Sequence, residues 1–139
     1  MKVIVDTSVW SLALRKKKLT DRELMVVKEL KELIYELRVI LIGPIRQELL
    51  SGISDENKFK NLREKMRAFD DIETTTLDYE RAAEINNTCK RNGIQGSHID
   101  YLICSVAQGN NHTIFTTDKD LEKYKNIIDL KLHTVREEI

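Results

Sequence analysis

The chain has 139 residues, of which 41% are hydrophobic and 33% are charged, so it can bury one core and is too short for two comfortable domains. Twenty-three Lys and Arg residues balance 23 Asp and Glu residues, and this neutral charge argues against a uniformly basic, nucleic-acid-binding surface. The longest apolar stretch, residues 39–45, contains glycine and proline and is too short to span a membrane. The first residues lack the features of a secretory signal, so we expect one cytoplasmic domain over residues 1–139.

The first third of the chain predicts a strand and two helices. An apolar run predicts a strand at residues 2–6, and a short helix follows through residues 10–14. Thr20 to Glu23 have the form of a capping box, which predicts that a longer helix begins at Thr20 and extends to about residue 37. Its apolar residues at helical spacing are expected to face the core: Leu30, Leu33, Ile34 and Leu37.

The middle of the chain predicts two further strands with helices between them. Residues 39–42 form a short, wholly apolar run that is typical of a buried parallel strand. A proline near the first turn then predicts a helix beginning at residue 43, with Glu48 on its second turn. A charged helix over residues 55–68 and a strand near residues 70–73 follow.

The last half of the chain continues this alternation. One helix is predicted to end at Arg91 and another to begin at Ser97. Residues 113–115 predict a strand, Thr117 is expected to cap a short helix, and residues 131–134 are expected to add an edge strand. Strands separated by helices favour an α/β fold with a mostly parallel sheet and helices on both faces. The functional crevice of such a sheet lies at the carboxyl ends of its strands.

Four acidic residues lie at element boundaries near these strand ends: Asp6, Glu48, Asp100 and Asp118. Asp6 and Asp100 adjoin apolar residues, which would partly remove their carboxylates from water. Carboxylates held together in a crevice of low dielectric repel one another unless a cation compensates their charge. Ligands that are all oxygen fit Mg²⁺ or Mn²⁺ better than zinc, so the sequence predicts a divalent-metal site.

Each acid also has a plain structural explanation when it is taken singly. Aspartates are favoured at helix starts, because they cap backbone N–H groups and interact with the helix dipole. Asp6 could cap the helix that follows it, whereas Asp100 and Asp120 each end a capping-box pattern. Glu48 could be an exposed helical residue. The combination of the four acids favours the metal site over these separate explanations.

The basic residues are clustered, mainly at residues 15–18 and 58–67. If the four boundary acids are neutralised by metal, 19 of the 23 acids remain against 23 basic residues, which leaves 23 − 19 = +4. The clusters form either a basic rim or ordinary solvated faces. Cys89 and Cys104 form no CxxC pair and are expected to be buried small hydrophobes. Nucleotide-binding, serine-hydrolase and histidine-rich zinc motifs do not occur, and His98 either lies at the surface or contacts substrate.

The order of four short segments resembles the PIN-domain family: Val5-Asp6-Thr7-Ser8, Pro44 to Leu50 around Glu48, His98 to Ile103 around Asp100, and Thr116-Thr117-Asp118. The similarity covers nearly the whole chain, and a single domain of this length looks most like a VapC-type toxin of a toxin–antitoxin pair. The resemblance implies a three-layer α/β/α sandwich with a mostly parallel central sheet. It also implies metal-dependent hydrolysis of RNA phosphodiester bonds by direct attack of water.

The resemblance assigns a role to each matching residue. It places Asp6, Glu48, Asp100 and Asp118 in a catalytic cluster that binds Mg²⁺ or Mn²⁺. Ser8 and Thr116 would support this cluster or a phosphate, and Asp120 matches a frequent secondary acid. The implied partners are an RNA substrate (tRNA, rRNA or mRNA), a cognate antitoxin protein that covers the acidic crevice, and a second copy of the chain in a homodimer. The basic residues expected to guide the RNA backbone are Arg15 to Lys18, or Lys119 and Lys123.

Two alternatives to a toxin remain open. The first is a housekeeping PIN nuclease that processes RNA without an antitoxin. The second is a catalytically weak PIN fold that binds protein or RNA, although the presence of all four acids argues against it. A phosphatase of the haloacid-dehalogenase kind with Asp6 as nucleophile is disfavoured, because that chemistry needs a second aspartate where this chain has Ser8.

Overall fold

The computed structural model describes residues 1–15 and 17–136. These ranges contain seven helices and four strands, close to the predicted bounds and in the order β1 (Val3–Val5), α1 (Thr7–Leu14), α2 (Asp21–Tyr35), β2 (Val39–Ile42), α3 (Gly43–Leu50), α4 (Glu56–Met66), β3 (Asp71–Ile72), α5 (Thr76–Arg91), α6 (His98–Asn110), β4 (Thr113–Phe115) and α7 (Lys119–Lys125). None of the described helices is long and apolar enough to cross a membrane.

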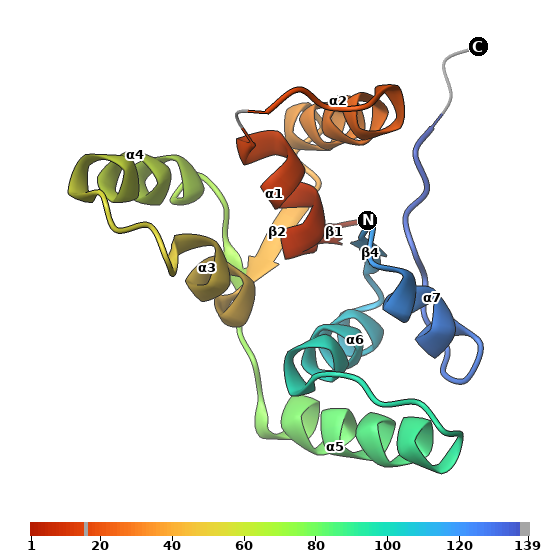
Figure 1. Cartoon of the computed structure of the whole chain (residues 1–139). Coiled ribbons are helices and arrows are strands. Elements are labelled where there is room, and N and C mark those ends of the chain that lie inside the picture. The colour runs from red at the N-terminus through yellow and green to blue at the C-terminus, as the bar shows by residue number, and fades with distance from the viewer. Residues whose placement is uncertain (16, 137–139) are drawn as a thin grey trace.

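The four strands form one parallel sheet in the order β3-β2-β1-β4. Val3 of β1 lies opposite Val39 of β2 on one side and Thr113 of β4 on the other. Helices α1 and α2 lie on one side of the sheet, and α5 and α6 lie on the other (Figure 1). The fold is therefore a three-layer α/β/α sandwich, which confirms the predicted fold class.

This strand order creates a topological switch point between β1 and β4. From β1 the chain proceeds through β2 to β3 on one side, whereas β4 returns to the opposite side of β1. Side chains at the carboxyl ends of parallel strands gather in the crevice at such a point. Asp6 directly follows β1, and its backbone N–H donates to the carbonyl of Phe115, the last residue of β4, at 2.9 Å. The two strand ends are thus joined where candidate site residues follow them.

Strand β1 and helix α6 form the centre of the hydrophobic core. The three residues of β1 are each 0% exposed, as expected for a strand covered on both faces. Helix α6 is buried continuously from Tyr101 to Ala107, because it packs between the sheet and α5. Cys89 and Cys104 are free thiols within this core, which confirms the prediction that they act as small hydrophobes.

Helix α2 begins as predicted but ends earlier than predicted. Thr20 and Glu23 form the reciprocal capping box, and Leu30 and Leu33 are buried. The prediction that Leu37 faces the core was wrong, because its side chain is 79% exposed. Leu37 lies beyond the end of the helix in the left-handed backbone region, with φ of 58°, so it no longer continues the helical face.

Helix α7 is capped by Asp118, so the predicted cap at Thr117 was wrong. Asp118 Oδ1 accepts a hydrogen bond from the N–H of Asp120 at 2.9 Å. The N–H of Thr117 donates instead to the hydroxyl of Ser8 at 3.0 Å. Thr117 therefore joins the turn after β4 to α1 and does not begin the helix.

The segment after α7 lies beside β4 without forming the predicted edge strand. It adds a single parallel bridge between Leu132 and Ile114. The backbone hydrogen bonds of this bridge join Ile114 to Lys131 and His133. Beyond them, the segment is held by side chains of α2, so the regular pairing of a strand does not continue.

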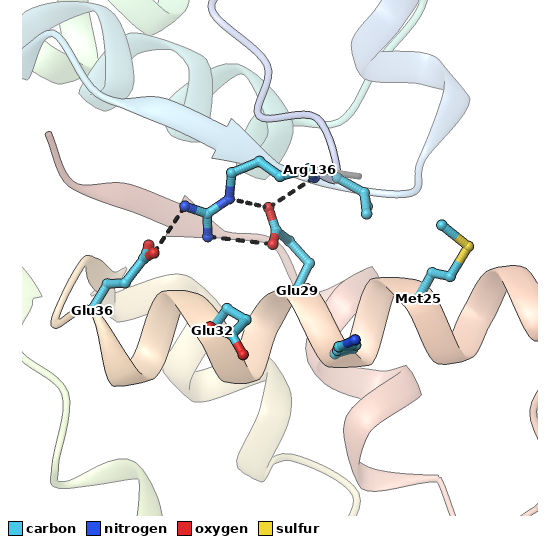
Figure 2. A pocket seen from close by; sticks show the side chains of 7 residues that line it. Met25, Glu29, Glu32, Glu36 and Arg136 are labelled. Atoms are coloured by element: carbon cyan, nitrogen blue, oxygen red, sulfur yellow. Dashed lines mark hydrogen bonds and ion pairs between the residues drawn. The ribbon is translucent and has the colours of Figure 1, made fainter. Parts of the chain in front are cut away.

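Glu29 of α2 fastens this C-terminal segment. Its carboxylate accepts hydrogen bonds from the side chain of Arg136, with Nε at 2.9 Å (Figure 2). It also lies 2.7 Å from His133 Nε2. Burial raises the pKa of Glu29, but the hydrogen bonds from Arg136 and His133 outweigh it and leave the pKa below its ordinary value. A hollow at this place contains none of the candidate site residues and is lined by Met25, Lys28, Glu29, Glu32, Glu36, Val135 and Arg136.

Candidate functional site

Asp6 occupies the N-cap position of α1, yet its side chain does not cap that helix. Its Oδ2 accepts hydrogen bonds from the hydroxyls of Ser8 and Thr116, each at 2.8 Å. Asp6 is 8% exposed. A buried carboxylate needs such donors, and here both of them hold Oδ2. The helix-capping explanation therefore fails for this residue.

The same two hydroxyls connect the turns that follow β1 and β4. Ser8 Oγ accepts from the N–H of Thr117 at 3.0 Å, and Thr116 Oγ1 accepts from the N–H of Asp118 at 3.0 Å. Because each hydroxyl accepts from the main chain, its proton remains available for donation to Asp6. This network places Asp6 and Asp118 at the same end of the sheet.

Asp100 lies in the first turn of α6, where Ser97 Oγ accepts from its N–H at 3.1 Å. Its Oδ2 accepts a hydrogen bond from the hydroxyl of Tyr124 at 3.4 Å. Burial raises the pKa of Asp100, and the negative charges of Asp6 and Asp118 raise it further, against the lowering effect of the Ser97 and Tyr124 hydroxyls. The negative charges of Asp6 and Asp118 therefore reach the carboxylate of Asp100.

This donor set suits a hard divalent cation. The oxygens of Asp6, Asp100 and Asp118 are carboxylate oxygens, which Mg²⁺ and Mn²⁺ prefer, and a cation would relieve the repulsion that they impose on Asp100. Among residues 1–15 and 17–136, no three Asp, Glu, His or Cys side chains are grouped closely enough to hold an ion. The charges of Asp6 and Asp118 thus affect Asp100, but the three side chains are not already arranged as a metal-binding site.

Glu48 and Asp120 stand apart from this group of three. Glu48 lies on the second turn of α3, as predicted, and its side chain is exposed. It is not among the largest influences on the pKa of Asp100. Asp120 is also exposed, and it forms an ion pair with Lys123 at 3.6 Å. His98 is exposed as the first residue of α6.

Tyr124 is a site neighbour that the sequence interpretation missed. It lies on α7, is 0% exposed and reaches Asp100 through its hydroxyl. The spacing of Leu121 and Tyr124 places two large, mainly apolar side chains on one face of a helix, and this could have predicted that both are buried. A buried tyrosine carries a hydroxyl that needs a partner, but the sequence does not say which residue supplies it.

The sequence profile described as PIN domain matches residues 3–127. The chain belongs to the PIN domain family. The match includes Asp6, Glu48, Asp100 and Asp118, together with all four strands of the sheet. PIN domains are nucleases, and they generally use divalent metal ions.

Solved structures of other PIN proteins share the fold of this chain. VapBC2 from Rickettsia felis, bound to a DNA fragment from its promoter, aligns with a TM-score of 0.75 at 19% identity, over 96% of this chain and 98% of that one. FitAcB from Neisseria gonorrhoeae aligns with a TM-score of 0.70 at 21% identity, over 94% and 96%. A toxin–antitoxin complex from Klebsiella pneumoniae aligns with a TM-score of 0.61 at 14% identity, over 85% and 88%. No curated protein matches the sequence.

Proposed function

We propose that this PIN domain is a Mg²⁺- or Mn²⁺-dependent endoribonuclease and the cytoplasmic toxin of a VapBC-type toxin–antitoxin pair. The observation that supports the activity best is the carboxylate of Asp6. It is buried, it is held by two hydroxyls and it does not cap the helix that it precedes. Its charge, with that of Asp118, acts on the partly buried Asp100. Carboxylates crowded in this way at the switch point of a sheet are typical of functional sites.

The proposed metal ligands are Asp6, Asp100 and Asp118, with Glu48 as the fourth acid. Glu48 is included because its side chain is exposed on α3 and makes no hydrogen bond within the described ranges, so it is available to a ligand. A bound divalent ion would lower the pKa of water and stabilise charge on the scissile phosphate. Ser8 and Thr116 hold Asp6 in place, so the protein supplies positioning and needs no nucleophile of its own.

Helix α7 is the better of two candidate surfaces for the RNA backbone. Its residues Lys119 and Lys123 are exposed on the helix that begins directly after Asp118. Arg15 of the other basic cluster is paired with Glu23 at 3.2 Å, and Lys16 lies outside the described residues. Lys123 is likewise paired, with Asp120 at 3.6 Å, so the position of α7 directly after Asp118 decides the choice. Lysines close to the acidic group would offset its repulsion of phosphates.

An antitoxin and a second copy of the chain are the proposed protein partners. The support for an antitoxin is the similarity to a structure described as a toxin–antitoxin complex, together with the similarity to VapBC2 and FitAcB. Large apolar side chains that a partner could cover are exposed at both ends of α2: Leu24 (52%), Met25 (49%), Tyr35 (86%) and Leu37 (79%).

The proposed activity predicts discrete, metal-dependent cuts in RNA. Purified protein incubated with mixed tRNA and ribosomal RNA is expected to cut at defined sites with Mg²⁺ or Mn²⁺, to stop when EDTA is added, and to resume when excess metal is restored. Sequencing of the fragment ends should find 5′-phosphates and 3′-hydroxyls, as direct attack by water requires. Cutting that persists in EDTA would contradict the proposal. RNA that is bound but left uncut under every metal condition would favour the binding-module alternative.

A further inference from the structure

Each of the three grouped aspartates has one oxygen held by a donor from this chain. Asp6 is held by two hydroxyls, and Asp118 is held by a backbone N–H. For Asp100 the donor is the Tyr124 hydroxyl, which bonds Oδ2. The terminal torsion of an aspartate is otherwise broad, so a single donor limits how the carboxylate is turned. The oxygen that is not held then points in a defined direction.

The Tyr124 hydroxyl is not explained by packing alone. The ring is 0% exposed and packs on the ring of Tyr101, with 5.2 Å between the centroids, and a phenylalanine would provide the same contact. A buried hydroxyl is costly unless it forms a hydrogen bond. Among the described residues, the partner of this hydroxyl is the Asp100 carboxylate, at 3.4 Å. Hydrogen bonds in active sites are often this long without ligand and shorten when a ligand is bound.

Gly96 provides the space that this contact needs. It lies directly before Ser97, the N-cap of α6. A Cβ at this position would collide with the Tyr124 hydroxyl and would lie 2.7 Å from the Tyr101 hydroxyl. Any side chain at position 96 would therefore push both rings away from the first turn of α6, where Asp100 lies.

We infer that Tyr124 is a positioning residue, whose hydroxyl fixes the carboxylate of Asp100 for metal binding, and that Gly96 makes this approach possible. The inference rests on the proposed function, because it concerns the same metal site. Tyr124 acts through Asp100 and contacts neither metal nor RNA. Loss of a donor that orients a metal ligand typically weakens metal binding by about 10- to 100-fold. The length of this hydrogen bond places the expected effect at about tenfold.

The neighbouring tyrosine provides a matched control. Tyr101 is 1% exposed, and its hydroxyl also faces Gly96, but within the described residues it makes no hydrogen bond to a carboxylate. Tyr124→Phe and Tyr101→Phe each remove one buried hydroxyl from the same pair of tilted, packed rings. A general effect of losing a buried hydroxyl would appear in both variants, whereas an effect on Asp100 would appear in Tyr124→Phe alone.

The test is the affinity for Mn²⁺ in the absence of RNA, followed by the electron paramagnetic resonance signal of free Mn²⁺. Tyr124→Phe is expected to bind Mn²⁺ about tenfold more weakly than the wild type, and Tyr101→Phe within about twofold of it. The Mn²⁺ concentration that gives half-maximal RNA cleavage should rise by the same factor, while the KM for RNA is unchanged.

The outcomes separate this inference from the proposed function. Equal Mn²⁺ affinity in Tyr124→Phe and the wild type would overturn the inference and leave the nuclease proposal intact. Equal weakening in both tyrosine variants would also overturn it, because the effect would then come from packing. A wild-type protein that binds no Mn²⁺ would overturn both. Thermal melting without metal shows whether each variant keeps the fold.

Discussion

Asp6→Asn is expected to lower kcat/KM for RNA cleavage by about a thousandfold or more. The substitution keeps the size of the side chain and an oxygen that can accept from the Ser8 and Thr116 hydroxyls, so the fold should be preserved. It removes the negative charge that would bind the metal ion. Metal catalysis supplies several kcal/mol of transition-state stabilisation, and about 4 kcal/mol corresponds to this factor. Initial rates on one cleavable RNA, measured with saturating Mg²⁺, give the result.

Asp55→Asn is the matched control for this measurement. Asp55 is also an aspartate at a helix N-cap, but it is exposed and its carboxylate accepts from the N–H of Lys58 at 3.0 Å. An asparagine can make the same cap, so activity should remain at the wild-type level. If Asp6→Asn kept more than about a tenth of the wild-type activity, its proposed role in holding metal would be wrong.

Mn²⁺ is expected to raise the melting temperature of the wild-type protein by roughly 8 °C, and to raise that of Asp100→Asn much less. A ligand at a hundredfold excess over its Kd stabilises a fold by about 2.7 kcal/mol, which is about this shift for a domain of this size. Differential scanning calorimetry at pH 7, with EDTA and then with Mn²⁺, measures both values. Asp55→Asn should respond to Mn²⁺ as the wild type does.

Without metal, Asp100→Asn is expected to melt at a higher temperature than the wild type. The folded-state pKa of Asp100 lies above its ordinary value of 3.8. Ionised Asp100 therefore lowers the free energy of unfolding at neutral pH. This loss of stability is absent below pH 3.8, and it develops as the pH rises through the folded-state pKa. Asparagine carries no charge, so Asp100→Asn should not suffer this loss of stability. A lower melting temperature for Asp100→Asn in EDTA would show that Asp100 stabilises the fold and is not held there at a cost.

Local sequence patterns predicted most of the helices and strands, because the formation of each depends mainly on nearby residues. The apolar run at residues 39–42 and the capping box at Thr20 formed strand β2 and the start of α2 as expected. Local patterns do not reveal features that depend on distant residues. Glu29 looks like an ordinary helical glutamate, yet it is buried by partners more than 100 residues away, at His133 and Arg136.

For the candidate site, motifs identified the acids but not how they are held. Asp6 was singled out from its position after an apolar strand, and the structure places it at the switch point. That its side chain turns from α1 to the hydroxyls of Ser8 and Thr116 depends on β4 lying beside β1. The contact of Tyr124 with Asp100 depends in the same way on packing between α6 and α7, which sequence spacing does not encode.

The measurement that tests the central claim most directly is the position of bound Mn²⁺, found from its anomalous scattering in crystals of the wild-type protein. The three grouped aspartates should bind the ion, so the account predicts a peak within about 2.5 Å of carboxylate oxygens of Asp6, Asp100 and Asp118. A fully soaked crystal with no peak at these residues, or with Mn²⁺ only at the glutamates of α2, would contradict the account.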